Sequence, residues 1–194
     1  MLIDGQKVPV RPGQTILEAA LANQIFIPHL CGSRHLGGCR LCLVQVGSQI
    51  KAACTQKAEP GLVVQTRTPQ VNKLVKMAWE LLVASHQMRC AECSQAADCQ
   101  LKKIARLRSL PLPTRTFPAL NKEKITLSND LILLKGQCLF CGKCIEQCQQ
   151  AGQGILGLAG KGEKRRLALW LNPNSCRDCQ KCLGLCGALV KTGN

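Results

Sequence analysis

Two cysteine runs with the same spacing constrain this chain more than any other feature of its sequence. Each run leaves two, two and three residues between successive cysteines, and together they hold eight of the 15 cysteines in 194 residues. With only 3% aromatic residues, the chain is poorly supplied for a large hydrocarbon core. Cysteine at this density indicates either a disulfide scaffold or a metal protein. The spacing of the runs favours the metal protein.

This spacing is the one that bacterial ferredoxins use for a pair of [4Fe-4S] cubanes. Three thiolates on a tight loop reach three irons of one cube, and the fourth, on the next helical turn, points to the other cube. We therefore assign one cubane to Cys138, Cys141, Cys144 and Cys186, and the other to Cys148, Cys176, Cys179 and Cys182. Structural zinc is the alternative, although zinc needs no exchange of a cysteine between runs. The ferredoxin run normally ends in Cys-Pro, whereas Gln149 and Gly187 follow here.

A second set of ligands combines one histidine with three cysteines. His86, Cys90, Cys93 and Cys99 leave three, two and five residues between them. The three cysteines have no fourth cysteine nearby, so the imidazole of His86 is the economical fourth ligand of a third [4Fe-4S] cluster. A neutral nitrogen ligand would also make that cluster less negative and shift its potential. A zinc knuckle or a buried, hydrogen-bonded histidine is the alternative interpretation.

A third set lies near the N-terminus. Cys31, Cys39, Cys42 and Cys54 leave seven, two and eleven residues between them. Four thiolates on the loops of a small domain fit a [2Fe-2S] cluster, and zinc is its rival. With His86, the 15 cysteines supply sixteen ligands, which complete four four-ligand clusters with no thiol left over.

The first segment, residues 1–67, is predicted to be a small α/β domain. Asp4-Gly5 predicts a tight hairpin turn between two short strands. Thr15 and Glu18 form a capping-box pattern that opens a helix over residues 16–22. Three more short strands are predicted at residues 43–46, 50–53 and 62–66. One helix packed on a mixed sheet follows from these elements.

Three further segments are predicted after this domain. Residues 68–110 form a helical segment, with helices at 69–85 and 100–110 on either side of the loop that holds three cysteines. Residues 111–130, with three prolines, form a linker. Residues 131–194 hold the two cysteine runs and a hairpin between residues 155–158 and 167–171.

The formal charge of +15 raises nucleic acid as a partner. Four clusters with their thiolates would add about −7 and leave about +8. Because the basic residues are scattered and aromatic residues are few, we expect no nucleic-acid binding. No secretory signal and no long apolar run are present, so we expect a cytoplasmic protein without membrane insertion.

With these motifs in place, the chain resembles the iron-sulfur module shared by three groups of proteins. These are the large NADH-oxidising subunit of complex I, the diaphorase small subunit of NAD-reducing hydrogenases, and [FeFe] hydrogenases. The stretches that carry the resemblance are residues 27–31, 38–42 and 138–144. It implies an α+β chain with a ubiquitin-like (β-grasp) [2Fe-2S] domain, a [4Fe-4S] domain with one histidine and three cysteine ligands, and a two-[4Fe-4S] ferredoxin domain.

The resemblance also implies a function. We expect an electron-transfer subunit of a hetero-oligomer, placed between a flavin and NAD(P)H-handling subunit and a catalytic hydrogenase or formate dehydrogenase subunit. No catalytic residue and no GxGxxG dinucleotide motif is found in the sequence. Two alternatives belong to other classes of protein: a free-standing ferredoxin-like carrier and a zinc-stabilised interaction module.

Overall fold

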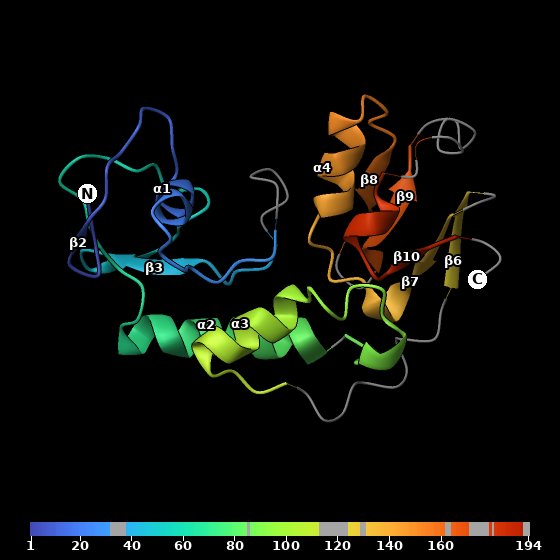
Figure 1. Ribbon diagram of the computed structural model, residues 1–194, viewed down its shortest axis with the longest axis horizontal. Coiled ribbons are helices and arrows are strands. Elements are labelled where there is room, and N and C mark those ends of the chain that lie inside the picture. Colours follow the sequence, from blue (N-terminus) through green and yellow to red (C-terminus); the bar gives the residue numbers. More distant parts are fainter. Residues whose placement is uncertain are drawn as a thin grey trace. The chain divides into compact units, whose positions relative to one another are not determined.

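The computed structural model of the protein describes residues 1–31, 38–84, 86–112, 124–128, 131–161, 164–170, 179 and 181–191. The chain divides into two compact units (Figure 1). The first unit consists of Met1–Leu30, Gly37–Leu81 and Leu101–Pro111, and the second of Cys31–Leu36, Leu82–Gln100 and Leu112–Asn194. The described elements make the chain α+β, which is the fold class expected from the sequence.

A five-stranded mixed sheet forms the centre of the first unit. Its strands are β1 (Leu2–Ile3), β2 (Gln6–Lys7), β3 (Leu43–Val46), β4 (Gln49–Ala52) and β5 (Val63–Gln65). They lie in the order β2-β1-β5-β3-β4, with β1 parallel to β5 and the other pairs antiparallel. The strands predicted from sequence are confirmed, with boundaries that differ by one residue at β4 and at each end of β5.

The first hairpin turns as predicted at Asp4 and Gly5. Both residues have positive φ angles, 48° and 84°, as a two-residue turn of the mirror-image type requires. The Asp4 carboxylate also accepts hydrogen bonds from the Thr66 backbone N–H (2.8 Å) and hydroxyl (2.6 Å). The turn is thereby tied to the chain that follows β5.

Helix α1 (Ile16–Ala22) packs on this sheet and begins at the predicted capping box. The Glu18 backbone N–H donates to Thr15 Oγ1 at 3.3 Å, and the Thr15 N–H donates to Glu18 Oε2 at 2.8 Å. Ile16, Leu17 and the following alanines are buried and join the apolar residues of the sheet in one core. The cap therefore fixes the start of a helix whose inner face is the centre of this unit.

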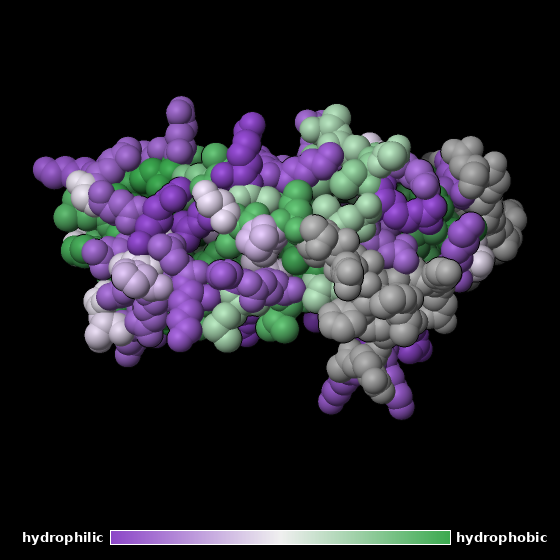
Figure 2. Space-filling view, turned by 90° about the horizontal axis from the view of Figure 1, so that it is seen from below, coloured by the Kyte–Doolittle hydropathy of each residue, from purple (hydrophilic) through white to green (hydrophobic). Residues whose placement is uncertain are grey.

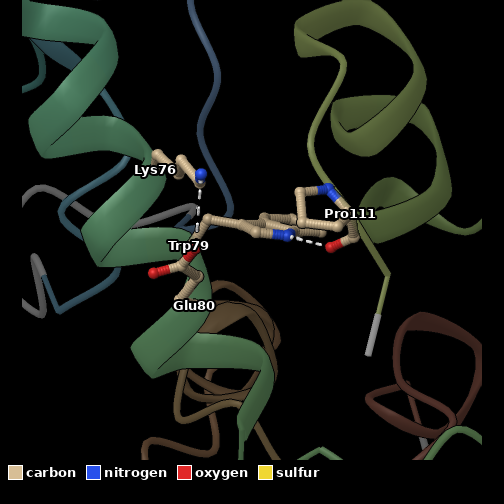
Figure 3. A network of polar contacts seen from close by, with 4 residues as sticks. All are labelled: Lys76, Trp79, Glu80 and Pro111. Carbon is tan, nitrogen blue, oxygen red and sulfur yellow. Dashed lines mark hydrogen bonds and ion pairs between the residues drawn. The ribbon is translucent and has the colours of Figure 1, made fainter. Parts of the chain in front are cut away.

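Helix α2 (Pro69–Ala84) carries one buried residue every four positions. Val71, Val75, Trp79 and Val83 are each 4% exposed or less, which is the spacing of one helix face. The Trp79 indole N–H donates to the carbonyl oxygen of Pro111 at 2.7 Å (Figure 3). The neighbouring Lys76–Glu80 ion pair is exposed and 3.9 Å long, so it contributes little stability.

Helix α3 (Gln100–Arg108) ends two residues before the sequence prediction. Ser109 has φ 51°, and the Leu110 N–H donates to the Ala105 carbonyl at 2.9 Å. This left-handed cap ends the helix before the prolines do.

Hydrophilic side chains cover much of the first unit's face in Figure 2, where α2 and α3 contribute lysines and arginines.

In its described residues, the second unit contains two small sheets, the helix α4 and the last turn of α2. Its elements are β6 (Lys124–Ser128), β7 (Leu131–Leu134), α4 (Lys143–Gln150), β8 (Leu156–Ala159), β9 (Arg166–Leu169) and β10 (Leu189–Val190), with 3₁₀ turns at Cys90–Glu92, Lys135–Gln137 and Leu183–Leu185. One sheet has the order β10-β7-β6, and the β8–β9 hairpin forms the other, as predicted.

The structure places a strand, β6, within the stretch that the sequence assigned to a linker. β6 pairs with β7 in antiparallel register, with a bulge between Thr126 and Ser128. Residues 113–123 and 129–130 of that stretch lie outside the described residues. Residues 124–128 alternate polar and apolar side chains, which is the pattern of a strand, but the prolines that precede them led to their assignment to the linker.

Candidate metal centres

The first predicted ligand set brings three of its four cysteines together in the first unit. Cys39 and Cys42 are buried, and burial is the main cause that raises the pKa of Cys42 to about 12. A hydrogen bond with the Cys54 backbone opposes part of this rise, whereas the charges of Cys54 and Cys39 add to it. Arg40, between the two buried cysteines, has φ 51°, a left-handed turn that tightens the loop. Cys31 is half-buried and belongs to the second unit.

The loop that precedes α4 gathers the first ferredoxin set. Phe140 and Gly142 have φ angles of 49° and 80°, so the backbone turns sharply twice between Cys138 and Cys144. Burial raises the pKa of Cys138 to about 12 and that of Cys144 further. Cys141 adds to both shifts, because a second negative charge nearby opposes ionisation.

Cys186, from the second run, lies among the thiols of the first run. It is the largest electrostatic contributor to the raised pKa values of Cys138 and Cys144. Its own pKa is raised mainly by burial, with further contributions from Cys141 and from Cys93 of the histidine set. The four thiols that the sequence assigned to one cubane are therefore close together.

The other ferredoxin set lines a hollow. Cys148, Cys179 and Cys182 border a space of about 270 Å³, counting the solvent at its mouth. Ile155 and Leu156 form an apolar wall beside them. Cys176, the fourth predicted ligand, lies outside the described residues. Three soft sulfur donors around an apolar hollow are the donor chemistry that an iron-sulfur cluster needs.

Arg165 is a positive group beside the first ferredoxin set. It lowers the pKa of Cys138, partly opposing the effect of burial. Its guanidinium carbon lies 5.8 Å from the centroid of the Phe140 ring, in cation–π geometry, which holds the charge next to the cysteine loop. Sequence reasoning missed this residue, because it lies more than twenty positions from the loop and only the β8–β9 hairpin brings it close.

His86 lies two residues after the end of α2 and is half-buried. Its Nδ1 atom is buried and has no hydrogen-bond partner. Burial lowers the pKa of His86, and a hydrogen bond with the Gln137 backbone opposes part of that shift. The ring is therefore kept neutral with an unpartnered nitrogen, which fits a metal ligand better than a buried histidine held by hydrogen bonds. Cys90, Cys93 and Cys99 are all half-buried in the loop that follows.

None of the described cysteines forms a disulfide. Within the described part of the chain, no three His, Cys, Asp or Glu side chains converge in a way that could hold a metal ion. Thiols of one predicted set can therefore lie near one another without the geometry of a formed metal site. None of the helices in the described ranges has the length and apolar character that a membrane span requires.

Comparison with known proteins adds independent findings. Residues 1–69 match the model of the 2Fe-2S iron-sulfur cluster binding domain. The 78 kDa subunit of the mitochondrial NADH-ubiquinone oxidoreductase of Neurospora crassa is 30% identical over 90% of this chain, and the γ subunit of the NAD-reducing hydrogenase HoxS of Cupriavidus necator is 28% identical over 86% of it. The chain is homologous to subunits of NADH-ubiquinone oxidoreductase and of NAD-reducing hydrogenase. The resemblance stated from the sequence motifs is thereby confirmed.

The homology covers the relatives unequally. The matched region is 24% of the 78 kDa protein and 74% of the hydrogenase γ subunit. A crystal structure of a NAD⁺-reducing [NiFe]-hydrogenase in the H₂-reduced state contains a chain of the same fold, with a TM-score of 0.77 and 28% identity. That likeness covers 98% of this chain and 86% of the hydrogenase chain. Both units therefore have counterparts in that structure.

Proposed function

We propose that this protein is an iron-sulfur subunit that relays electrons within a hetero-oligomeric oxidoreductase. One observation carries this proposal. The last cysteine of each run lies with the other run: Cys186 is close to Cys138 and Cys144, and Cys148 borders the hollow with Cys179 and Cys182. A two-cubane ferredoxin requires this exchange, whereas separate zinc sites do not. Homology to oxidoreductase subunits supports the same class.

The proposed cofactors are one [2Fe-2S] cluster and three [4Fe-4S] clusters. Their ligands are Cys31, Cys39, Cys42 and Cys54; His86, Cys90, Cys93 and Cys99; Cys138, Cys141, Cys144 and Cys186; and Cys148, Cys176, Cys179 and Cys182. When bound, each cluster supplies reversible one-electron chemistry at a potential that its surroundings set.

The chain's own residues prepare these sites in three ways. The buried thiols must lose their protons before they bind iron, so their raised pKa values couple metal binding to proton release. His86 offers a neutral nitrogen, which reduces the negative charge at its site. Arg165 places a positive charge next to Cys138, where it favours the thiolate.

The proposed partners are those that the sequence resemblance implies, and the similarity to subunits of NAD-linked complexes supports a hetero-oligomer. One is a subunit that binds a flavin and NAD(H) or NADP(H), and the other is a catalytic subunit of the hydrogenase or formate dehydrogenase type. In this arrangement the chain itself has no catalytic residue: its residues hold the clusters, fix their positions and exclude water.

Metal analysis of anaerobically purified protein tests the cofactor part. We expect about fourteen irons per chain with a similar amount of acid-labile sulfide and little zinc. About four zinc ions per chain without sulfide would instead assign the protein to the structural zinc class.

Purification of the chain with an affinity tag from its natural host tests the partner part. We expect a flavin-containing subunit and a catalytic subunit to elute with it in fixed proportion. A complex lacking this chain should still reduce an artificial dye with NADH or NADPH but should lose reduction of the catalytic subunit. If the chain elutes alone and still accepts electrons, it is a free-standing carrier and not a relay subunit.

A further inference from the structure

The residue after the last cysteine of the second run, Gly187, lies against the loop of the histidine set. A carbon placed at the Cβ position of Gly187 would lie 2.6 Å from Cys93 Sγ. Carbon and sulfur atoms that are not bonded need roughly 3.5 Å or more. Any larger residue here would therefore displace Cys93 or the backbone of residue 187.

The backbone conformation does not account for this glycine. The residues with positive φ in the described part of the chain do not include Gly187, so a left-handed φ is not what requires glycine here. The ferredoxin spacing would place a proline here, and a proline would also carry a Cβ. The need for a glycine thus comes from the approach of Cys93 and not from a turn.

Two hydrogen bonds keep the loop in this position. The Gln95 side-chain amide donates to the Gly184 carbonyl at 3.0 Å, and the Gln87 N–H donates to the Gly136 carbonyl at 2.7 Å. The loop is thus attached to the ferredoxin part of the second unit on both sides of Cys93. Gln137 Oε1 and Gln95 Cβ lie 3.8 and 3.9 Å from the same Cβ position, so the remaining space is also filled.

We propose that Gly187 is a positioning residue that lets Cys93 approach Cys186, so that one electron passes directly between the histidine set and the ferredoxin set that contains Cys186. This inference rests on the proposed function, because it needs clusters at both sets. The step is one electron lost at one centre and gained at the other, with no bond made or broken and no proton moved. The rate of this electron transfer falls steeply with distance, so a displacement of Cys93 would slow it.

A free thiol and an iron-bound thiolate respond differently to a methyl group at residue 187. A free Cys93 side chain can rotate away from it, but a ligated sulfur cannot rotate without leaving its iron. Gly187→Ala should therefore disturb the protein with its clusters bound more than the protein without them. Gly184 provides a matched control, because a Cβ there meets nothing within 4 Å.

The test compares Gly187→Ala with Gly184→Ala in the cluster-containing protein, by electron paramagnetic resonance of the fully reduced state. We expect the magnetic interaction between the two neighbouring clusters, seen as splitting of their signals, to be equal in wild type and in Gly184→Ala and weaker in Gly187→Ala. Iron and sulfide are measured on every sample.

A second variant, Gln95→Ala, removes the hydrogen bond to Gly184 without adding a methyl group. It should weaken the splitting while retaining wild-type iron, and it decides the question if Gly187→Ala does not assemble its clusters. Equal splitting in wild type and in every assembled variant would overturn the inference, as would iron-loaded wild type without splitting. Wild type without iron and sulfide would instead overturn the proposed function.

Discussion

The two compact units differ in what their cores are made of. The core of the first unit consists mainly of aliphatic side chains from α1 and the five-stranded sheet; among the described residues it contains one buried cysteine, Cys42, with Cys54 packed against it. The core of the second unit includes the buried cysteines Cys144, Cys148 and Cys182, with Cys138 and Cys186 packed against it. In the second unit, the predicted ligands are part of the core itself.

This difference indicates which of the two units needs its metal clusters in order to fold. A core of isoleucine, valine and alanine gains its stability from burial whether or not iron is present. A core built around thiols loses part of that gain when the thiols must stay protonated and nothing fills the space between them. We therefore expect the first unit to fold without its cluster and the second to depend on its clusters.

The largest expected effect follows from removing the iron. Treatment with a chelator under reducing, anaerobic conditions should abolish protection of backbone amides from hydrogen exchange in α4, β7 and the β8–β9 hairpin. The amides of β3, β4 and β5 should remain protected. If both units lost protection together, the distinction between their cores would be wrong.

Replacing single ligands should distinguish the stability of the two units while removing one cluster at a time. Cys141→Ser should lose about four irons and lower the melting temperature of the second unit. Cys54→Ser should lose about two irons and leave the first unit folded, because its aliphatic core is intact. Iron analysis with circular dichroism checks both. A Cys141→Ser protein with full iron would show that the ligand assignment is wrong.

Deleting core volume in the first unit tests the same comparison from the other side. Ile16 is fully buried at the start of α1, so Ile16→Ala should lower the free energy of unfolding of this unit by about 2–5 kcal/mol. The effect should be the same with and without iron. Leu81→Ala, at a residue that is 78% exposed, is the control and should change that free energy by less than about 0.5 kcal/mol.

The smallest effect is expected at the helix cap. Thr15→Ala removes the side-chain acceptor of the Glu18 N–H and should cost about 1 kcal/mol of unfolding free energy. Urea denaturation of the first unit measures it, and Thr15→Ser, which keeps the hydroxyl, should recover most of the loss. A loss of similar size in Thr15→Ser would mean that packing and not capping is responsible.

Local signals explain which parts of the fold could be predicted from sequence. The Asp4-Gly5 turn, the Thr15–Glu18 capping box and the buried spacing of α2 each depend on residues within a few positions of one another, and each is confirmed. The strand β10 and the pairing of β6 with β7 were not predicted. The alternating residues of β6 were a local signal that the prolines outweighed, whereas β10 has only two residues and depends on its tertiary pairing with β7.

Some residues of the candidate sites could likewise be predicted from sequence and others could not. The four ligand sets were predicted from cysteine spacing, from the ferredoxin rule that exchanges the fourth cysteine between runs, and from the count of ligands that pointed to His86. The contributions of Arg165 and Gly187 could not be found from spacing, since only the folded chain brings Arg165 to Cys138 and Cys93 to Gly187. Tertiary structure therefore decides which residues shift the pKa of a ligand and which allow two sets to lie close together.

The meeting of Cys186 with Cys138 and Cys144 also bears on how the protein is made. On the ribosome, Cys138 emerges first, and the thiol that joins its set is 48 residues further along (186 − 138). Cys148 is likewise synthesised before Cys179 and Cys182, the residues with which it borders the hollow. A nascent chain that ends between the two runs would therefore expose incomplete sets, so cluster delivery is expected after translation of the second run, and premature termination there should yield a protein without either ferredoxin cluster.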